Sequence, residues 1–224
     1  MALLATRNDG KLRELLPVFA NASMSVMTLV TAGIAEADDE HVLEAFDTFE
    51  LNALAKARWF ARLGPDQMVF ADDSGLEVDA LDGRPGVHSK RWSGRSDLSG
   101  PLLDEANNAF LLTALARAAT GGRVMRSARY VCAAACVWGG GELVVRGTCE
   151  GTILSAGRGD GGFGYDPYFL SHDLQATFAE VPIGEKQRVS HRARAFGRLL
   201  RMLRDATDSC RKWSAPVDPA RQLG

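Results

Sequence analysis

In the sequence MVFADDSGLEVDAL, residues 68–81, an apolar segment runs directly into an acidic pair. The apolar residues 68–71 predict a buried strand, and Asp72 and Asp73 follow it without a break. Residues 76–81 then resume an extended pattern. We therefore expect a strand that ends at the acidic pair, so that two carboxylates lie at the carboxyl end of a sheet strand.

Strands and helices are predicted on both sides of this segment. Apolar runs bounded by turn residues indicate strands, and apolar residues three and four positions apart indicate helices. The predicted strands are residues 2–5, 25–30, 130–138 and 143–145. The predicted helices are residues 11–19, 48–64, 101–118 and one around 196–203. This mixture predicts an α/β fold with a mixed sheet.

The composition describes one folded unit of enzyme size. The chain has 224 residues, with 46% hydrophobic and 24% charged, and 26 Lys and Arg against 28 Asp and Glu give a net charge of −2. A nucleic-acid binder is usually more basic, so we expect no stable nucleic-acid binding. No apolar run approaches the roughly 18–20 residues of a membrane span, so we expect no membrane partner. We expect one domain over residues 1–209 and a tail over residues 210–224.

The cysteines bear on the compartment. Cys132, Cys136, Cys149 and Cys210 are few and irregularly spaced, without a second close pair or a nearby histidine. Such cysteines do not have the spacing of a zinc site. In a chain of this length they indicate a reducing compartment, where a free cysteine behaves as a small core residue. We therefore expect a cytoplasmic protein.

The segment after the first predicted strand has the residues of an anion site. Backbone N–H groups at a helix N-terminus, together with amide, hydroxyl and ammonium groups, converge there. The spacing of a Walker loop is absent. An ordinary helix N-cap followed by a solvated lysine is the alternative. The segment consists of Thr6, Arg7, Asn8, Asp9, Gly10 and Lys11.

The acidic pair suits a divalent cation. Carboxylate oxygens are the ligands that Mg²⁺ prefers. Adjacent side chains of an extended backbone point to opposite faces, so we expect one of Asp72 and Asp73 to reach the metal and the other to brace the loop through hydrogen bonds. An Asx-turn without a metal is the alternative.

A glycine-rich loop follows at residues 157–164. Gly159, Gly161 and Gly164 match G-x-G-x-x-G, but residues 165–167 read Tyr-Asp-Pro where a dinucleotide site needs a helix, so we reject a Rossmann site. The loop can instead present Phe163 for stacking on a base, which is worth about 1–3 kcal/mol per base. Packing of Phe163 in the core is the alternative.

Basic residues precede the last predicted helix. Lys186, His191 and Arg192 could donate hydrogen bonds to phosphate or to the carbonyl oxygens of a base. A lone histidine is, however, usually structural. We interpret the later arginines as the solvated face of the helix and not as a DNA-binding patch, since they alternate with its apolar face. These are Arg194, Arg198, Arg201 and Arg204.

Five motifs follow one another in a fixed order. They are Thr6-x-Asn8-x-x-Lys11, ADDSGL at residues 71–76, Gly83-x-Pro85-Gly86, GGFGYDP at residues 161–167, and Ser190-His191-Arg192. In this order, from Ala2 to about Leu203, the chain resembles the inosine/xanthosine triphosphate pyrophosphatase family.

The resemblance implies an activity and an architecture. The family hydrolyses ITP, dITP and XTP to the monophosphate and pyrophosphate, which removes bases that would miscode in DNA and RNA. Its members have an α/β fold with a long, mixed, curved sheet, flanking helices and two lobes around a central cleft. They are magnesium-dependent homodimers. The resemblance therefore implies a house-cleaning hydrolase with a purine nucleoside triphosphate as substrate, Mg²⁺ as cofactor and a second copy as partner.

The resemblance also assigns roles to residues. It places metal binding and catalysis on Asp73, and a second metal ligand on Glu44. Residues 6–11 and Lys56 would bind phosphate, and Ser74 would contact substrate. The base-binding residues would be Phe163, Gly164, Tyr165, Asp166, Lys186, His191 and Arg192.

The chain departs from the family pattern next to Glu44. The family's following glycine is Phe46 here, and its later glutamate is Leu51. This departure weakens the metal assignment of Glu44 and leaves two alternatives to the expected activity open. One is a nucleotide-binding sensor with impaired catalysis, and the other is a pyrophosphatase for modified pyrimidine triphosphates.

Overall fold

The fold is built on one six-stranded mixed sheet. The computed structural model describes residues 2–37, 40–64, 67–119 and 125–213, and the side chains of all these except 41–42 and 207–213. The strand order is β2-β1-β3-β4-β5-β6, with β1 parallel to β2 and β3 and all later pairs antiparallel. The strands are β1 (Ala2–Leu4), β2 (Val26–Thr28), β3 (Met68–Val78), β4 (Ser127–Trp138), β5 (Gly141–Ile153) and β6 (Phe169–Ser171). The predicted mixed sheet is confirmed.

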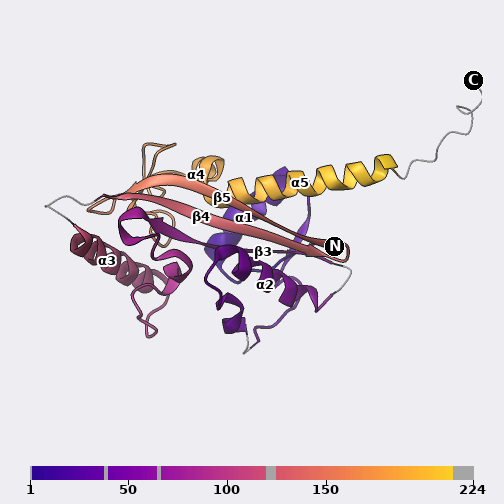
Figure 1. Ribbon diagram of the computed structural model, residues 1–224, viewed down its shortest axis with the longest axis horizontal. Helices are drawn as coiled ribbons and strands as arrows, with labels where there is room; N and C mark the ends of the chain where they lie inside the picture. Colours follow the sequence, from indigo (N-terminus) through magenta and orange to yellow (C-terminus); the bar gives the residue numbers. More distant parts are fainter. Residues whose placement is uncertain (1, 38–39, 65–66, 120–124, 214–224) are drawn as a thin grey trace, which may run out of the picture.

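Helices cover both faces of the sheet (Figure 1). α1 and α5 pack on one face, through Phe19 and Phe196, and α2 packs on the other, through Phe60. α3 packs beside the far halves of β3 and β4 through Leu111 and Leu115. The helices are α1 (Asp9–Asn21), α2 (Phe49–Ala61), α3 (Gly100–Ala118), α4 (Ile183–Val189) and α5 (His191–Trp213), with 3₁₀ turns η1 (Glu40–Glu44), η2 (Asp79–Leu81) and η3 (Gly86–Arg91).

Local sequence signals explain where the helices begin. Asn8 is the N-cap of α1, and its Oδ1 accepts a hydrogen bond from the backbone N–H of Lys11 at 3.0 Å. Thr48 is the N-cap of α2 and accepts from the N–H of Leu51 at 3.2 Å. Both caps satisfy backbone donors that have no partner inside the helix. Pro101 lies in the first turn of α3, as predicted.

The prediction that a strand ends at the acidic pair is wrong. β3 runs unbroken from Met68 to Val78, with Asp72 opposite Ala134 and Asp73 opposite Ala133 of β4. The long antiparallel hairpin of β4 and β5 supplies a hydrogen-bonding partner along the whole of β3. The two carboxylates therefore lie in the middle of β3, just beyond its pairing with β1, and on opposite faces.

Gly75 lets η3 cross β3 at close range. A Cβ at this position would lie 2.4 Å from the carbonyl oxygen of Gly86 and 2.4 Å from Oγ of Ser89. In the space left by the missing Cβ, Ser89 Oγ accepts a hydrogen bond from the N–H of Leu76 at 2.8 Å and donates to Gly86 at 2.6 Å.

The carboxyl-terminal helix reaches past the end of the predicted domain. α5 continues to Trp213, so residues 210–213 of the predicted tail are helical, and residues 214–224 lie outside the described part of the chain. Among the described helices, none combines the length and the apolar character needed to cross a bilayer.

Candidate functional site

One cleft collects most of the predicted site residues. It has a volume of about 1370 Å³ and is lined by the start of α1, by η1, β3 and α5, and by the glycine-rich loop. Lys11 and Asp73 line it together, as the resemblance required. The predicted residues that line it are Thr6, Arg7, Asn8, Asp9, Lys11, Glu44, Lys56, Asp73, Ser74, Phe163, Gly164, Tyr165, Asp166 and Arg192.

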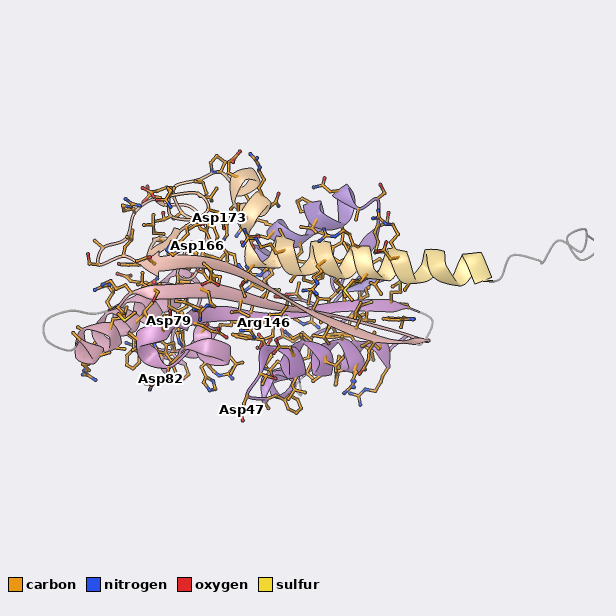
Figure 2. All side chains as sticks on the ribbon, turned by 45° about the horizontal axis from the view of Figure 1, so that its top comes forward. Asp47, Asp79, Asp82, Arg146, Asp166 and Asp173 are labelled. Atoms are coloured by element: carbon orange, nitrogen blue, oxygen red, sulfur yellow. The ribbon has the colours of Figure 1, made fainter. Side chains whose placement is uncertain are left out.

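A smaller cavity holds two more of them. Gly10 and Lys186 line this space of about 140 Å³, which shares the ring of Phe163 with the larger cleft. His191 lines neither space. Gly162 and Phe163 of the glycine-rich loop line both spaces. Asp166, which follows this loop, lies on the α4 side of the sheet (Figure 2).

Asp72 faces α1 and α5, where it is fully buried among cations. Its Oδ2 lies 2.9 Å from Nζ of Lys11 and 3.6 Å from Nε of Arg192, and it accepts a hydrogen bond from Ser74 Oγ at 3.1 Å. Burial by itself raises the pKa of Asp72, but Lys11 and Arg192 outweigh it and hold the pKa at about 2. Asp72 is therefore the member of the pair that braces the site.

Asp73 faces α2 and the cleft. Its Oδ2 accepts a hydrogen bond from Nδ2 of Asn52 at 2.9 Å, and its Oδ1 accepts from the N–H of Ser74 at 2.9 Å. Burial raises the pKa of Asp73, Lys11 opposes this rise, and the negative charge of Glu44 adds to it. The prediction that the two acids point to opposite faces is confirmed.

Glu44 and Lys56 form an ion pair at the same end of the cleft. Nζ of Lys56 also donates to the carbonyl oxygen of Asp72 at 3.0 Å, which ties α2 to the middle of β3. Burial by itself raises the pKa of Glu44, but Lys56 and then Lys11 lower it below its ordinary value. Glu44 is thus an ionised carboxylate close enough to Asp73 to raise the pKa of Asp73.

The acids of this end fit a hard divalent cation only in part. Asp73 and Glu44 offer carboxylate oxygens in one cleft, and Mg²⁺ is commonly held by one or two carboxylates together with substrate phosphates and water. Among the described residues, no group of three or more His, Cys, Asp or Glu side chains forms a complete protein cage. The donor set therefore suits a cation that arrives with, or is completed by, an oxygen-rich ligand.

At the other end, Asp166 anchors the glycine-rich loop. Its Oδ2 accepts from the N–H of Phe163 at 2.9 Å and lies 2.6 Å from Nζ of Lys186, while Tyr130 donates to its Oδ1 at 3.1 Å. Gly162 makes this possible, because its φ is +74° and a Cβ there would lie 2.2 Å from Oδ2 of Asp166.

The ring of Phe163 lies close to α1 and to two cations. Lys186 Nζ is 5.0 Å and the Arg192 guanidinium 5.3 Å from its centroid, which are cation–π distances. A Cβ on Gly10, in the first turn of α1, would lie only 2.7 Å from an edge atom of the ring. Phe163 is half-buried and lines the cleft, so its ring packs against the protein and is also accessible to a ligand in the cleft.

Two residues that were predicted to bind the ligand, His191 and Arg7, contact other residues of the protein. The ring of His191 is 1% exposed and stacks on Tyr130 at 4.7 Å and 8°. Burial lowers the pKa of His191 well below its usual value, and Arg192 lowers it further. Arg7 binds both carboxylate oxygens of Glu40, at 2.6 and 2.7 Å, which holds η1 against the start of α1.

Three polar residues of the site were not predicted. Glu14 of α1 is buried between Lys186 and Arg192. Asn52 of α2 binds Asp73 and also the backbone N–H and carbonyl of Phe46 at 2.9 and 3.1 Å. Asn52 is four residues after Thr48 and four before Lys56, so the three polar residues share one face of the helix. This spacing could have identified Asn52 as a site residue. Asn108 of α3 donates to the carbonyl of Gly164 at 2.9 Å and could not be placed from sequence.

Comparison with known proteins gives matches over nearly the whole chain. Residues 2–202 match the family model described as Ham1 family. A dITP/XTP pyrophosphatase of Frankia alni is 44% identical over 211 residues, which are 92% of this chain and 98% of that protein. A dITP/XTP pyrophosphatase of Mycobacterium bovis is 47% identical over 203 residues, 90% of this chain and 94% of that protein. A solved HAM1 protein from Coxiella burnetii superposes with a TM-score of 0.76 at 31% identity, covering 91% of this chain and 98% of that one.

Proposed function

The chain belongs to the Ham1 family, and we propose that it is a nucleoside-triphosphate pyrophosphatase. It hydrolyses deaminated purine nucleoside triphosphates (dITP, ITP and XTP) to the nucleoside monophosphate and pyrophosphate. The observation that carries this proposal is that one cleft is lined both by Lys11 and Asp73 and by the loop that carries Phe163. A triphosphate and its base can therefore be bound together.

The phosphate end supplies positive charge where negative charge develops. Nζ of Lys11 and Nζ of Lys56 would bind phosphate oxygens and offset the charge of the departing pyrophosphate. The first backbone N–H groups of α1, which begins at Asp9, would add hydrogen-bond donors for a phosphate at the helix N-terminus. Asp73 would orient the water that attacks the α-phosphorus and accept its proton at a carboxylate oxygen, a role that its raised pKa favours.

We propose Mg²⁺ as the cofactor, held by Asp73 and, directly or through water, by Glu44. When bound, the cation supplies charge withdrawal from phosphate oxygens and a lower pKa for bound water. Asn52 keeps Asp73 oriented toward the cleft, and Lys56 does the same for Glu44.

The base end discriminates by hydrogen bonding. Donors of Arg192, whose NH2 reaches Ser74 Oγ at 2.9 Å, and of Lys186 would recognise the 6-keto oxygen of a deaminated purine, while Phe163 stacks on its ring. ATP carries a 6-amino group there, which leaves these buried donors unpaired and can cost on the order of 10⁴-fold in kcat/KM. The remaining predicted contacts, including that of His191, stay proposals.

We further propose a homodimer in a reducing, cytoplasmic compartment. The three cysteines whose side chains are described, Cys132, Cys136 and Cys149, are free and buried, and burial raises the pKa of each thiol. Such thiols are poorly reactive and suit a reducing environment. Light scattering on the purified chain tests the dimer, and a mass of one copy, 24.1 kDa, would refute it.

A substrate panel tests the activity. The protein is incubated with Mg²⁺ and, separately, ITP, dITP, XTP, GTP, ATP, dUTP or methylated dTTP, and products are separated by ion-exchange chromatography. We expect monophosphate and pyrophosphate from ITP, dITP and XTP in at least about 100-fold preference over ATP. Preference for a pyrimidine would support the alternative substrate class.

A charge-neutral variant separates the enzyme from a binding protein. Asp73→Asn should lower kcat for ITP by at least about 100-fold while ITP binding persists. Asp97→Asn is the matched control, because Asp97 is exposed, pairs with Arg95 at 2.7 Å and does not line the cleft. If the wild-type chain binds ITP but releases no pyrophosphate, it is a sensor.

A further inference from the structure

Glu14 is a buried acid of α1 that makes no contact in the reaction described above. Its side chain is 3% exposed, with Oε1 2.7 Å from Nζ of Lys186 and Oε2 accepting a hydrogen bond from NH1 of Arg192 at 2.8 Å. Burial by itself raises the pKa of Glu14, but the charges of Arg192 and Lys186 outweigh the effect of burial and lower this pKa below its ordinary value. Glu14 is therefore an anion held between two cations.

This acid completes a balanced set of buried charges. Lys11 binds Asp72, Asp72 lies beside Arg192, Arg192 binds Glu14, Glu14 binds Lys186, and Lys186 binds Asp166 at 2.6 Å. The chain of contacts joins the phosphate end to the base end. It holds three cations and three anions, so the set as a whole is neutral, and the loss of one acid leaves one uncompensated positive charge in a buried site.

The balanced set borders the proposed base site. Lys186 and Arg192 lie over the ring of Phe163, and Glu14 lines the small cavity beside that ring together with Lys186. A purine that stacks on Phe163 would therefore lie close to both cations and to the acid that compensates them. In a buried site a charge acts over several ångströms with little screening.

The two classes of deaminated purine differ in charge. The hypoxanthine of ITP is neutral at neutral pH, whereas the more acidic xanthine of XTP loses a ring proton and is largely anionic. We propose that Glu14 is a positioning residue that sets the preference between these bases, by cancelling the positive charge that Lys186 and Arg192 would otherwise present to the base. This inference rests on the proposed function.

The test compares two substrates in three proteins. The ratio of kcat/KM for XTP to kcat/KM for ITP is measured at neutral pH for the wild type, Glu14→Gln and Glu142→Gln. Glu14→Gln should raise the ratio about tenfold, because the exposed positive charge attracts the anionic base. Glu142→Gln changes net charge equally, but Glu142 is exposed and pairs with Arg58 away from the cleft, so the ratio should stay unchanged. Damage to packing alone would lower both rates and leave the ratio constant.

A second pair of variants covers the case in which Glu14→Gln does not fold. Lys186→Gln should lower the ratio, and Glu14→Gln combined with Lys186→Gln restores neutrality and should return it toward the wild-type value. Equal ratios in these two proteins, or an unchanged ratio in a folded Glu14→Gln, would overturn the role of Glu14. A wild type that hydrolyses neither substrate would instead overturn the proposed function.

Discussion

Gly147 of β5 controls how closely α5 approaches the sheet, and Gly147→Ala tests this spacing. A Cβ at position 147 would lie 2.5 Å from the backbone nitrogen of Ala195 and 2.6 Å from the carbonyl oxygen of His191. Both atoms belong to the backbone of the first turns of α5, so no rotamer change can make room. The strand and helix must move apart instead.

The expected cost follows from overpacking. Extra methylene groups forced into a close-packed core cost about 1–3 kcal/mol, and we expect the upper part of this range, about 2–3 kcal/mol, because backbone has to shift. For a domain of this size that lowers the melting temperature by about 4–12 °C. Because the same turn carries Arg192, kcat/KM for dITP should fall by about tenfold or more at temperatures where the variant is fully folded.

Gly197→Ala is the matched control for this prediction. Gly197 lies inside α5, and the nearest atom to an added Cβ is NH1 of Arg201 at 3.6 Å, an ordinary contact with a flexible side chain. The same substitution should therefore raise stability here, by about 0.5–1 kcal/mol, since alanine is the better helix former. Urea unfolding of both variants measures the change in the free energy of unfolding, which should be negative for Gly147→Ala and positive for Gly197→Ala. A Gly147→Ala protein with the same free energy of unfolding as the wild type would show that Gly147 does not set the spacing between β5 and α5.

Three further predictions concern the cleft. Asn52→Ala removes hydrogen bonds to Asp73 and to both backbone groups of Phe46, so the free energy of unfolding in urea should fall by about 2–3 kcal/mol. Steady-state kinetics should show a lower kcat, and a change in KM alone would contradict this role. Arg7→Ala and Glu40→Gln should raise KM for dITP to the same extent, because Arg7 acts by holding η1; a rise in Arg7→Ala alone would instead indicate direct phosphate binding. Removal of divalent cations with EDTA should abolish hydrolysis, and added Mg²⁺ should restore it. The melting temperature should change little, because Asp73 and Glu44 already have protein partners. Full activity in EDTA would refute the proposal of a divalent cofactor.

The elements with local signals were predictable. The caps Asn8 and Thr48 and the proline at the start of α3 each satisfy or remove a backbone donor at a helix start, and these effects depend only on neighbouring residues. The β4 and β5 hairpin was predicted from two apolar runs around a glycine turn. The family was identified from five motifs, because their order along the chain can be recognised without a structure.

The length of β3 was not predictable from its own residues. Two carboxylates and a serine normally interrupt a strand, and this interruption is what residues 72–74 predicted. Pairing with β4 overrides that preference. Lys11 from α1 forms an ion pair with Asp72, and Asn52 from α2 donates a hydrogen bond to Asp73 on the opposite face. These partners are 61 and 21 residues away in the chain, so no local pattern reveals which acid each of them meets.

The amino-acid pattern alone was enough to predict the types of elements, the family and a set of candidate phosphate-binding residues, because each prediction depends on short-range spacing or on motif order. Three contacts could be found only from the folded chain: His191 stacks on Tyr130, Arg7 binds Glu40 of η1, and Glu14 lies between Lys186 and Arg192. A charged or aromatic side chain can form equivalent contacts with many residues of the same chemical type. Which partner it meets depends on how the helices pack across the sheet, and that packing is a property of the whole chain.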